Sequence, residues 1–333
     1  MPSYPDDTAT PAPLTDPRSR PGQMSSTRRS ESVWAVWGAL ALVYVIWGST
    51  YLGIRVVAEH LPAFGSAAVR FGVAAALLAA VLVVIRGFGA LRISPRQLAA
   101  CAVVGTFLLV GGNGLVVLAE SPRFGVPSGV AALLVALGPI LMVIFRAASG
   151  DRPRAATVAG VVIGFGGLAA LFLPGAEESD HPVPVVGGVL VLVAVLCWTV
   201  GSFATRWLPM PADPFVASVF EMATGAALME LIAVARREPP VWTATAAPTE
   251  AWLALAYLIV FGSLVAFTAF VWLLHHAPLS LTMTYAYVNP VIALLLGAVL
   301  VGEVLTGQLV LAAAVVVLGV VLVVSTERPT RTG

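Results

Sequence analysis

The sequence predicts an all-α membrane protein with ten transmembrane helices in two inverted five-helix repeats. Three observations lead to this prediction: the composition, an internal repeat and the placement of arginine. Of the 333 residues, 59% are hydrophobic and only 11% are charged, and the mean hydropathy is +0.95. A soluble domain carries about 25% charged residues, so a chain this poor in charge is expected to lie in a lipid bilayer.

The internal repeat has a fixed offset of 151 residues and needs no gap. Alanine, valine and leucine matches mean little in so apolar a chain, but the scarcer residues also keep the register. The matched pairs are Trp47/Trp198, Arg55/Arg206, Phe64/Phe215, Gly111/Gly262, Pro127/Pro278 and Pro139/Pro290. Two such halves with an odd number of spans each must lie in opposite orientations, as in many transporters.

Each half contains five apolar segments of about 20 residues, the length that a bilayer core requires. In the first half we expect spans at 33–55, 62–85, 97–119, 126–146 and 156–174. In the second half we expect spans at 185–205, 214–235, 251–274, 279–301 and 305–325. Proline stands at several segment starts, where its missing N–H costs little, namely at Pro62, Pro127, Pro214 and Pro278.

The domain organisation follows from these spans. Residues 1–32 are rich in proline, serine, threonine, aspartate and arginine, so a disordered cytoplasmic tail is expected there. The first repeat covers 33–174 and the second covers 185–326. The connection 175–184 is acidic and lacks arginine, which predicts an extracytoplasmic linker, and 327–333 form a cytoplasmic tail.

Arginine placement predicts the orientation, because positive residues collect on the cytoplasmic side. With both termini inside, the cytoplasmic side holds thirteen arginines and the outside four. The outside arginines are Arg55, Arg123, Arg236 and Arg237. The same orientation makes the two repeats inverted, because five spans separate each matched pair.

Several classes of protein are excluded. All 18 basic residues are arginine, and without lysine there is no phosphate-binding Walker A loop and no Schiff-base chemistry. No continuous basic face points to nucleic acid. Cys101 and Cys197 lie in apolar runs and are interpreted as small buried residues. His275 and His276 are adjacent on a helix and point apart, so we expect no metal site and no cofactor.

Aromatic and hydroxyl side chains mark the first segment of each half as a candidate cavity wall. Tyr44 and Trp47 share one helix face, and Thr50 follows them. Trp198 and Ser202 occupy the corresponding segment of the second half. The alternative is an interfacial aromatic belt, which suits Tyr51 better than the deeper Tyr44 and Trp47.

Two charged residues occupy repeat-related positions within the membrane. Arg70 is a candidate for binding an anionic group, although it could instead tie helix ends to backbone carbonyls. Glu221 takes the equivalent place and is the candidate proton carrier or ligand of a substrate amine, with a structural hydrogen bond as the alternative. Glu230, two and a half turns on, faces another way and is expected to be interfacial.

The remaining candidates are polar residues in apolar surroundings. Asn113 follows Gly111-Gly112, and a buried amide must find a partner. Tyr285 and Asn289 share a helix face just before Pro290, which can kink the helix. Either a ligand or interhelical hydrogen bonding would explain them. Gly160 and Gly164 have the spacing of close helix packing.

Longer motifs resemble the EamA family of the drug/metabolite transporter superfamily, and within it the YedA-type inner-membrane transporters. They are Trp47-Gly48-Ser49-Thr50-Tyr51 with Arg55, Arg70-Phe71, Gly112-Asn113-Gly114, Val126-Pro127-Ser128-Gly129, Thr284-Tyr285-Ala286-Tyr287-Val288-Asn289-Pro290 and Gly302-Glu303. The resemblance implies that helices 1–4 and 6–9 enclose a central cavity and that helices 5 and 10 pack outside it. It also implies a location in the bacterial inner membrane.

The expected function is secondary-active transport by alternating access, most simply export of small metabolites, amino acids or drugs. The expected partners are a small-molecule substrate and the lipid bilayer, and the sequence leaves open whether the protein forms a homodimer. Two alternatives remain: a membrane-embedded enzyme acting on lipid-linked substrates, and a passive channel.

Overall fold

The structure, a computed structural model, describes residues 23–126, 131, 134–151, 153–170, 185–292 and 307–326. Several sequence predictions therefore lie outside the described residues: the linker 175–184, the tail 327–333, most of the Val126–Gly129 motif and the Gly302-Glu303 pair. The chain separates into two units, Met1–Ala35 and Val36–Gly333. The architecture described below is that of the second unit.

Every regular element among the described residues is helical. In the first half the elements are α1 (Gln23–His60), α2 (Ala63–Arg86), η1 (Phe88–Leu91), α3 (Pro95–Gly105), η2 (Thr106–Gly114), α4 (Leu115–Glu120), α6 (Gly138–Ala148) and α7 (Ala155–Ala170). In the second half they are α8 (Val185–Ala204), α9 (Pro214–Ala235), η3 (Val241–Thr243), α10 (Thr249–Tyr257), η4 (Leu258–Val265), α11 (Ala266–His276), α12 (Leu279–Thr282) and α14 (Gly307–Thr326).

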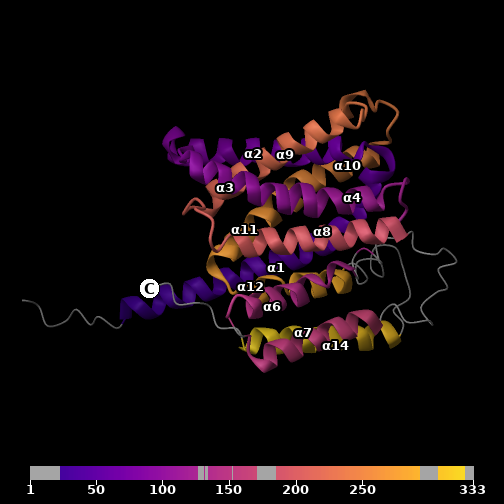
Figure 1. Cartoon of the computed structure of the whole chain (residues 1–333). Helices are drawn as coiled ribbons and strands as arrows, with labels where there is room; N and C mark the ends of the chain where they lie inside the picture. The colour runs from indigo at the N-terminus through magenta and orange to yellow at the C-terminus, as the bar shows by residue number, and fades with distance from the viewer. Residues whose placement is uncertain are drawn as a thin grey trace, which may run out of the picture. The chain divides into compact units, whose positions relative to one another are not determined.

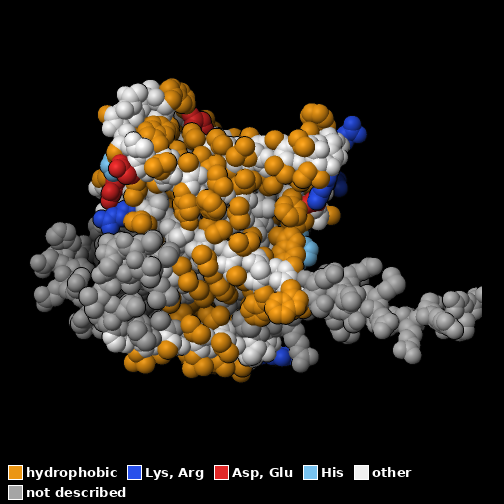
Figure 2. Space-filling model, turned by 180° about the vertical axis from the view of Figure 1, so that it is seen from behind, with side chains coloured by type: hydrophobic (Ala, Val, Ile, Leu, Met, Phe, Trp, Pro, Cys, Tyr) orange, Lys and Arg blue, Asp and Glu red, His pale blue; other side chains and the backbone are white. Residues whose placement is uncertain are grey.

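In the described part of the chain, six helices are long and apolar enough to cross a membrane. They span Val33–His60, Ala63–Arg86, Pro95–Glu120, Val185–Ala204, Pro214–Ala235 and Thr249–His276, close to six of the ten predicted segments. The other four segments are described only in part, as α6, α7, α12 and α14 with their flanks. Figure 2 shows hydrophobic side chains over the middle of one face, with charged and histidine side chains toward its ends.

The first helix begins earlier than the sequence predicted. We expected a disordered tail over 1–32, but α1 starts at Gln23. The sequence explains the new boundary, because Pro21 and Gly22 are the last helix breakers before the apolar run. From Gln23 onward the polar residues contain no proline or glycine until Gly38, so the helix can extend ahead of the membrane-spanning part.

Repeat-related helices pack against each other in antiparallel pairs. Figure 1 shows α2 beside α9 and, on the other side of the bundle, α7 beside α14. At one end of the first pair, Arg86 of α2 is ion-paired with Asp213, which caps α9. At the other end, the start of α2 contacts Glu238, just beyond α9. Opposite directions of equivalent helices are what an inverted repeat produces.

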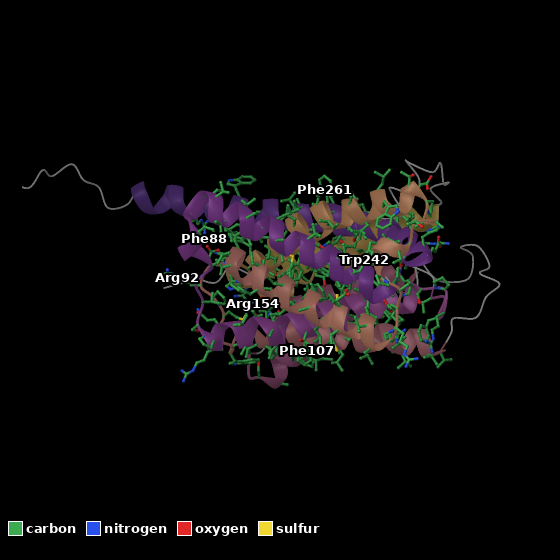
Figure 3. All side chains as sticks on the ribbon, turned by 90° about the horizontal axis from the view of Figure 1, so that it is seen from above. Phe88, Arg92, Phe107, Arg154, Trp242 and Phe261 are labelled. Carbon is green, nitrogen blue, oxygen red and sulfur yellow. The ribbon has the colours of Figure 1, made fainter. Side chains whose placement is uncertain are left out.

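The connections at the ends of α2 and α9 agree with this direction. In Figure 3, Phe88 and Arg92, which follow α2, lie at one end of the bundle, and Trp242, which follows α9, lies toward the other. The contacts at the two ends are also alike. Arg86 lies 6.0 Å from the ring centre of Phe215, and Arg236 lies 5.5 Å from that of Phe64, so an arginine covers the repeat-related phenylalanine at each end.

The third helix of each half widens into a π-helical segment at its centre. These segments, η2 and η4, lie at repeat-related positions, because the 151-residue offset carries Thr106–Gly114 onto 257–265. Phe107 and Phe261, at the two segments, lie on opposite sides of the bundle (Figure 3). The sequence predicted only uninterrupted spans here. π-Helical turns are rare and often occur at functional sites. The segments η2 and η4 are therefore candidates for positions near such a site.

The two halves cap their second helices differently. Asp213 caps α9 by accepting a hydrogen bond from the Phe215 N–H at 2.8 Å. The corresponding residue before α2 is Pro62, which has no side-chain acceptor. Glu238 replaces it from the other half, since its Oε2 accepts hydrogen bonds from the N–H groups of Phe64 and Gly65, both at 3.0 Å. A carboxylate at a helix start also complements the helix dipole.

Glu238→Ala is expected to lower the free energy of unfolding by about 1 kcal/mol, the usual loss when a helix start loses its cap. Glu59→Ala is the matched control, because Glu59 makes an exposed i,i+4 ion pair with Arg55 and such pairs contribute little. The measurement is the thermal midpoint of the purified protein in detergent. Equal midpoints for the two variants would show that Glu238 does not stabilise α2.

Candidate functional site

A cavity of about 100 Å³ lies where the two halves meet. It has room for a small organic group. The described residues of its wall come from the first four helical segments of the first half and from the first, third and fourth of the second half. They are Trp47, Thr50, Tyr51, Ile54, Arg70, Phe71, Leu109, Gly112, Asn113, Val116, Val135, Gly138, Ala194, Val195, Trp198, Thr199, Gly262, Phe267, Met283, Tyr285, Ala286 and Asn289.

Seven of the ten predicted site residues belong to this wall: Trp47, Thr50, Arg70, Asn113, Trp198, Tyr285 and Asn289. No described wall residue comes from α7 or α14, the helices for which the family resemblance implies a place outside the cavity. The resemblance also placed the seventh helix around the cavity. The structure differs there, because α9 contributes no described residue to the wall.

Four aromatic rings meet at the centre of the molecule. The repeat-related Trp47 and Trp198 contact each other edge to face, with ring centres 5.5 Å apart. Phe270 lies 5.1 Å from Trp47 and 5.2 Å from Trp198, and Tyr285 lies 4.9 Å from Trp47. Aromatic pairs at these distances stabilise one another beyond their burial. Trp47, Trp198 and Tyr285 belong to the cavity wall, and Phe270 packs against all three of them.

The two tryptophans differ in their hydrogen bonding. The Nε1–H of Trp47 donates to the backbone oxygen of Gly262 in η4 at 3.1 Å. Trp198 packs against Gly112 of η2, where a Cβ atom would lie 2.6 Å from its Cε3. Its own Nε1 is buried and has no partner among the described residues. A buried indole N–H without an acceptor is unfavourable, so Trp198 can donate to a molecule in the cavity.

Arg70 is the one arginine of the described wall and is only 4% exposed. Its Nε donates to the Oγ of Ser263 at 2.8 Å, and no carboxylate among the described residues pairs with it. The guanidinium also lies against η4, since a Cβ on Gly262 would be 3.0 Å from Nη2. Arg70 is therefore held by η4 rather than neutralised.

The two predicted asparagines behave differently. The Oδ1 of Asn113 is buried without a partner among the described residues. With its amide nitrogen turned toward them, Asn289 donates to the backbone oxygens of Tyr44 and Tyr285, both at 3.1 Å. Interhelical hydrogen bonding, which the sequence left open, therefore holds for Asn289, whereas Asn113 has an acceptor free for a ligand.

Tyr44, Ser202 and Glu221, which the sequence also singled out, are not among the described residues of the cavity wall. The hydroxyl of Tyr44 lies 2.5 Å from the Oγ1 of Thr284, and that of Ser202 donates to the backbone oxygen of Trp198 at 2.8 Å. Both hydroxyls thus have partners within the protein. Sharing a helix face with Trp47 or Trp198 is not enough, because the cavity is shorter than the helices that surround it.

Glu221 lies in the contact between α9 and α3 instead. It is 1% exposed, and its backbone oxygen would be 2.5 Å from a Cβ on Gly105. Both carboxylate oxygens are buried and lack a partner among the described residues. Repeat-related positions therefore do different things in the two halves, since Arg70 reaches the cavity and Glu221 does not.

The structure adds two polar residues, Tyr51 and Ser263, to those that the sequence singled out for the site. Tyr51, expected in an interfacial belt, belongs to the cavity wall, four residues after Trp47 on the same helix face. Ser263 is the partner of Arg70, and its only signal was its place beside Gly262, which the internal repeat matches to Gly111. Cys101 and Cys197 are free thiols, and no cluster of metal-binding residues occurs in the described chain.

The comparisons with known proteins agree with this architecture. The EamA-like transporter family matches twice, at residues 33–173 and 185–325. The chain is 36% identical to the uncharacterized inner membrane transporter YedA of Escherichia coli (strain K12) over 81% of its length and 84% of the relative. It is 27% identical to a probable terminal-alkyne amino-acid exporter of Streptantibioticus cattleyicolor, over 87% and 93% of the two chains.

A solved crystal structure superimposes with a TM-score of 0.69 at 25% identity and covers 88% of this chain and 97% of the other. The two family matches divide the chain where the internal repeat divides it. The named relatives are transporters, not enzymes. The chain is a member of the EamA-like transporter family.

Proposed function

We propose that the protein is a secondary-active exporter that moves small organic solutes by alternating access through the central cavity. The observation that carries the proposal is the position of the cavity between the two halves, where repeat-related Trp47 and Trp198 form one wall. Rocking of two inverted halves around such a site would expose it to each side in turn. Export accords with the name of the relative from Streptantibioticus cattleyicolor.

The proposal includes ten membrane spans, inverted five-helix repeats and both termini in the cytoplasm of a bacterial inner membrane. The arginine distribution supports this orientation. On the arginine-rich side, Asp151 accepts hydrogen bonds from Arg146 and lies 3.7 Å from Arg206, and the Arg146 guanidinium lowers the pKa of that carboxyl. The contact between Asp151 and Arg206 connects the two halves and would have to break if the cavity opens toward that side.

Counterflow tests the proposed function directly. Purified protein is placed in liposomes loaded with unlabelled solute, and labelled solute is added outside. A transporter that alternates its access accumulates label transiently and saturates with solute concentration. A passive channel only equilibrates the label, so the absence of any overshoot with a solute that binds the protein would reject the proposal.

Proton coupling through Glu221 is the second part of the proposal. The supporting observation is a fully buried carboxylate without a partner among the described residues, between α9 and α3 and away from the cavity wall. Protonation there would change the packing of two helices rather than the contacts with a solute. Coupling would then be transmitted by helix movement.

Glu221→Gln is expected to abolish the stimulation of transport by a pH gradient while leaving counterflow intact. Glutamine keeps the shape of the side chain and cannot take up a proton. Glu230→Gln is the control, because Glu230 lies on the same helix in an exposed position. If the Glu221→Gln protein still responds to the pH gradient, the proton is carried elsewhere.

A further inference from the structure

We infer that the cavity binds a small organic anion, a carboxylate joined to an apolar ring, and that Arg70 makes the contact that selects for negative charge. This inference rests on the proposed function and names the substrate class of the same site. It begins from the charges of the cavity wall. Arg70 contributes a full positive charge, and the described wall contains no aspartate or glutamate.

The guanidinium of Arg70 keeps donors available for an oxyanion. Its Nε donates to the Oγ of Ser263, and its Cζ lies 4.8 Å from the ring centre of Phe71. The terminal nitrogens have no carboxylate partner among the described residues. Nη2 lies beside Gly262, which itself belongs to the cavity wall. Arginine binds carboxylates through two parallel hydrogen bonds, and such charge-assisted bonds are about twice as strong as neutral ones.

Because Arg70 is buried, its charge favours anionic ligands over cationic ones. A charge at 4% exposure without an opposing carboxylate is unfavourable, and an anionic ligand offsets part of that penalty while a cationic ligand increases it. The buried acids Glu120 and Glu221 do not compensate for it inside the cavity, since neither belongs to the described wall. A cation would meet Arg70 without any opposing carboxylate.

The rest of the wall suits a ring with few polar atoms. Trp47, Trp198 and Tyr285 present aromatic surface, and Phe267 and Met283 add apolar surface. Two unpaired polar atoms, the Nε1 of Trp198 and the Oδ1 of Asn113, can each accommodate one polar group of the ligand. The combination favours an aryl carboxylate over a lipid or a polyvalent anion, for which one buried arginine is too little positive charge.

Three ligands with one ring and different charge test the inference at pH 7. They are phenylacetate, an anion, phenylalanine, a zwitterion, and phenethylamine, a cation. Equilibrium binding of labelled phenylacetate to purified protein in detergent, with the other two as competitors, measures their relative affinities. Phenylacetate is expected to bind about ten-fold or more tightly than phenethylamine. This comparison uses the wild-type chain and depends on no variant.

Variants assign the preference to Arg70. Arg70→Gln is expected to weaken phenylacetate binding by about ten-fold or more and to remove the preference for the anion, while Arg70→Lys retains part of it. Arg55→Gln is the control, because Arg55 is exposed and paired with Glu59. Each variant is first checked for a single symmetrical peak in size exclusion.

Three outcomes would overturn the inference: no binding of phenylacetate, equal or tighter binding of phenethylamine, or an anion preference that survives in the Arg70→Gln protein. Counterflow of the same compounds separates this inference from the proposed function. Selective phenylacetate binding without counterflow would support the inferred anion selectivity and reject the proposed transport function. Counterflow of phenethylamine in preference to phenylacetate would support transport and overturn the inferred anion selectivity.

Discussion

Replacing Gly160 with leucine is expected to destabilise the folded protein by about 3 kcal/mol. A Cβ at this position in α7 would lie 2.7 Å from the backbone oxygen of Gly319 and 2.9 Å from the backbone nitrogen of Val323, both in α14. Backbone atoms cannot turn aside as a side chain can, so the two helices would have to separate. Helices in lipid associate largely through such close approach of small residues.

Gly166→Leu, in the same helix, is the matched control, because a Cβ there meets nothing within 4 Å. The thermal midpoint of the detergent-solubilised protein should fall sharply for Gly160→Leu and change little for Gly166→Leu. The two variants add the same side chain to the same helix, so equal midpoints would mean that the close contact between α7 and α14 does not stabilise the protein.

Gly112→Leu is expected to weaken ligand binding strongly and to abolish counterflow without unfolding the protein. Gly112 belongs to the cavity wall, and a Cβ on it would lie 2.6 Å from Cε3 of Trp198. The added side chain would occupy the cavity and displace Trp198 from its contacts with Trp47 and Phe270. A loss of about ten-fold or more in affinity for phenylacetate is expected.

Gly38→Leu is the control for this variant, because Gly38 is exposed and a Cβ there meets nothing within 4 Å. Gly112→Ala gives a graded test, since it adds the clash with Trp198 but little of the bulk that fills the cavity. Unchanged counterflow in a monodisperse Gly112→Leu protein would show that solute does not pass through this cavity.

Much of the site can be predicted from residue type and repeat register. Arg70, Asn113 and Trp198 stand out because charged, amide and indole groups are costly in lipid unless they face protein or water. The 151-residue offset pairs Trp47 with Trp198, and the two rings are in contact at the centre of the molecule. Similar reasoning fails for Ser202, whose hydroxyl is used within its own helix.

The case of Glu221 shows where register stops being informative. The repeat aligns it with Arg70, yet α2 turns Arg70 toward the cavity while Glu221 lies between α9 and α3. Arg70 and Glu221 have different neighbours because the two halves differ in sequence, so the symmetry that relates them is only approximate. Periodicity reports which face of a helix a residue is on, and not which neighbour that face meets.

Composition, segment length and the internal repeat are sufficient to establish a helical membrane protein of two related halves, because lipid allows few alternatives to apolar helices of fixed length. The placement of arginine along the chain also predicts the orientation, because positive residues collect on the cytoplasmic side. The π-helical segments, the close α7–α14 contact and the extent of the cavity depend on atoms far apart in the chain. Only packing in three dimensions decides them, and with them which polar side chains a solute can reach.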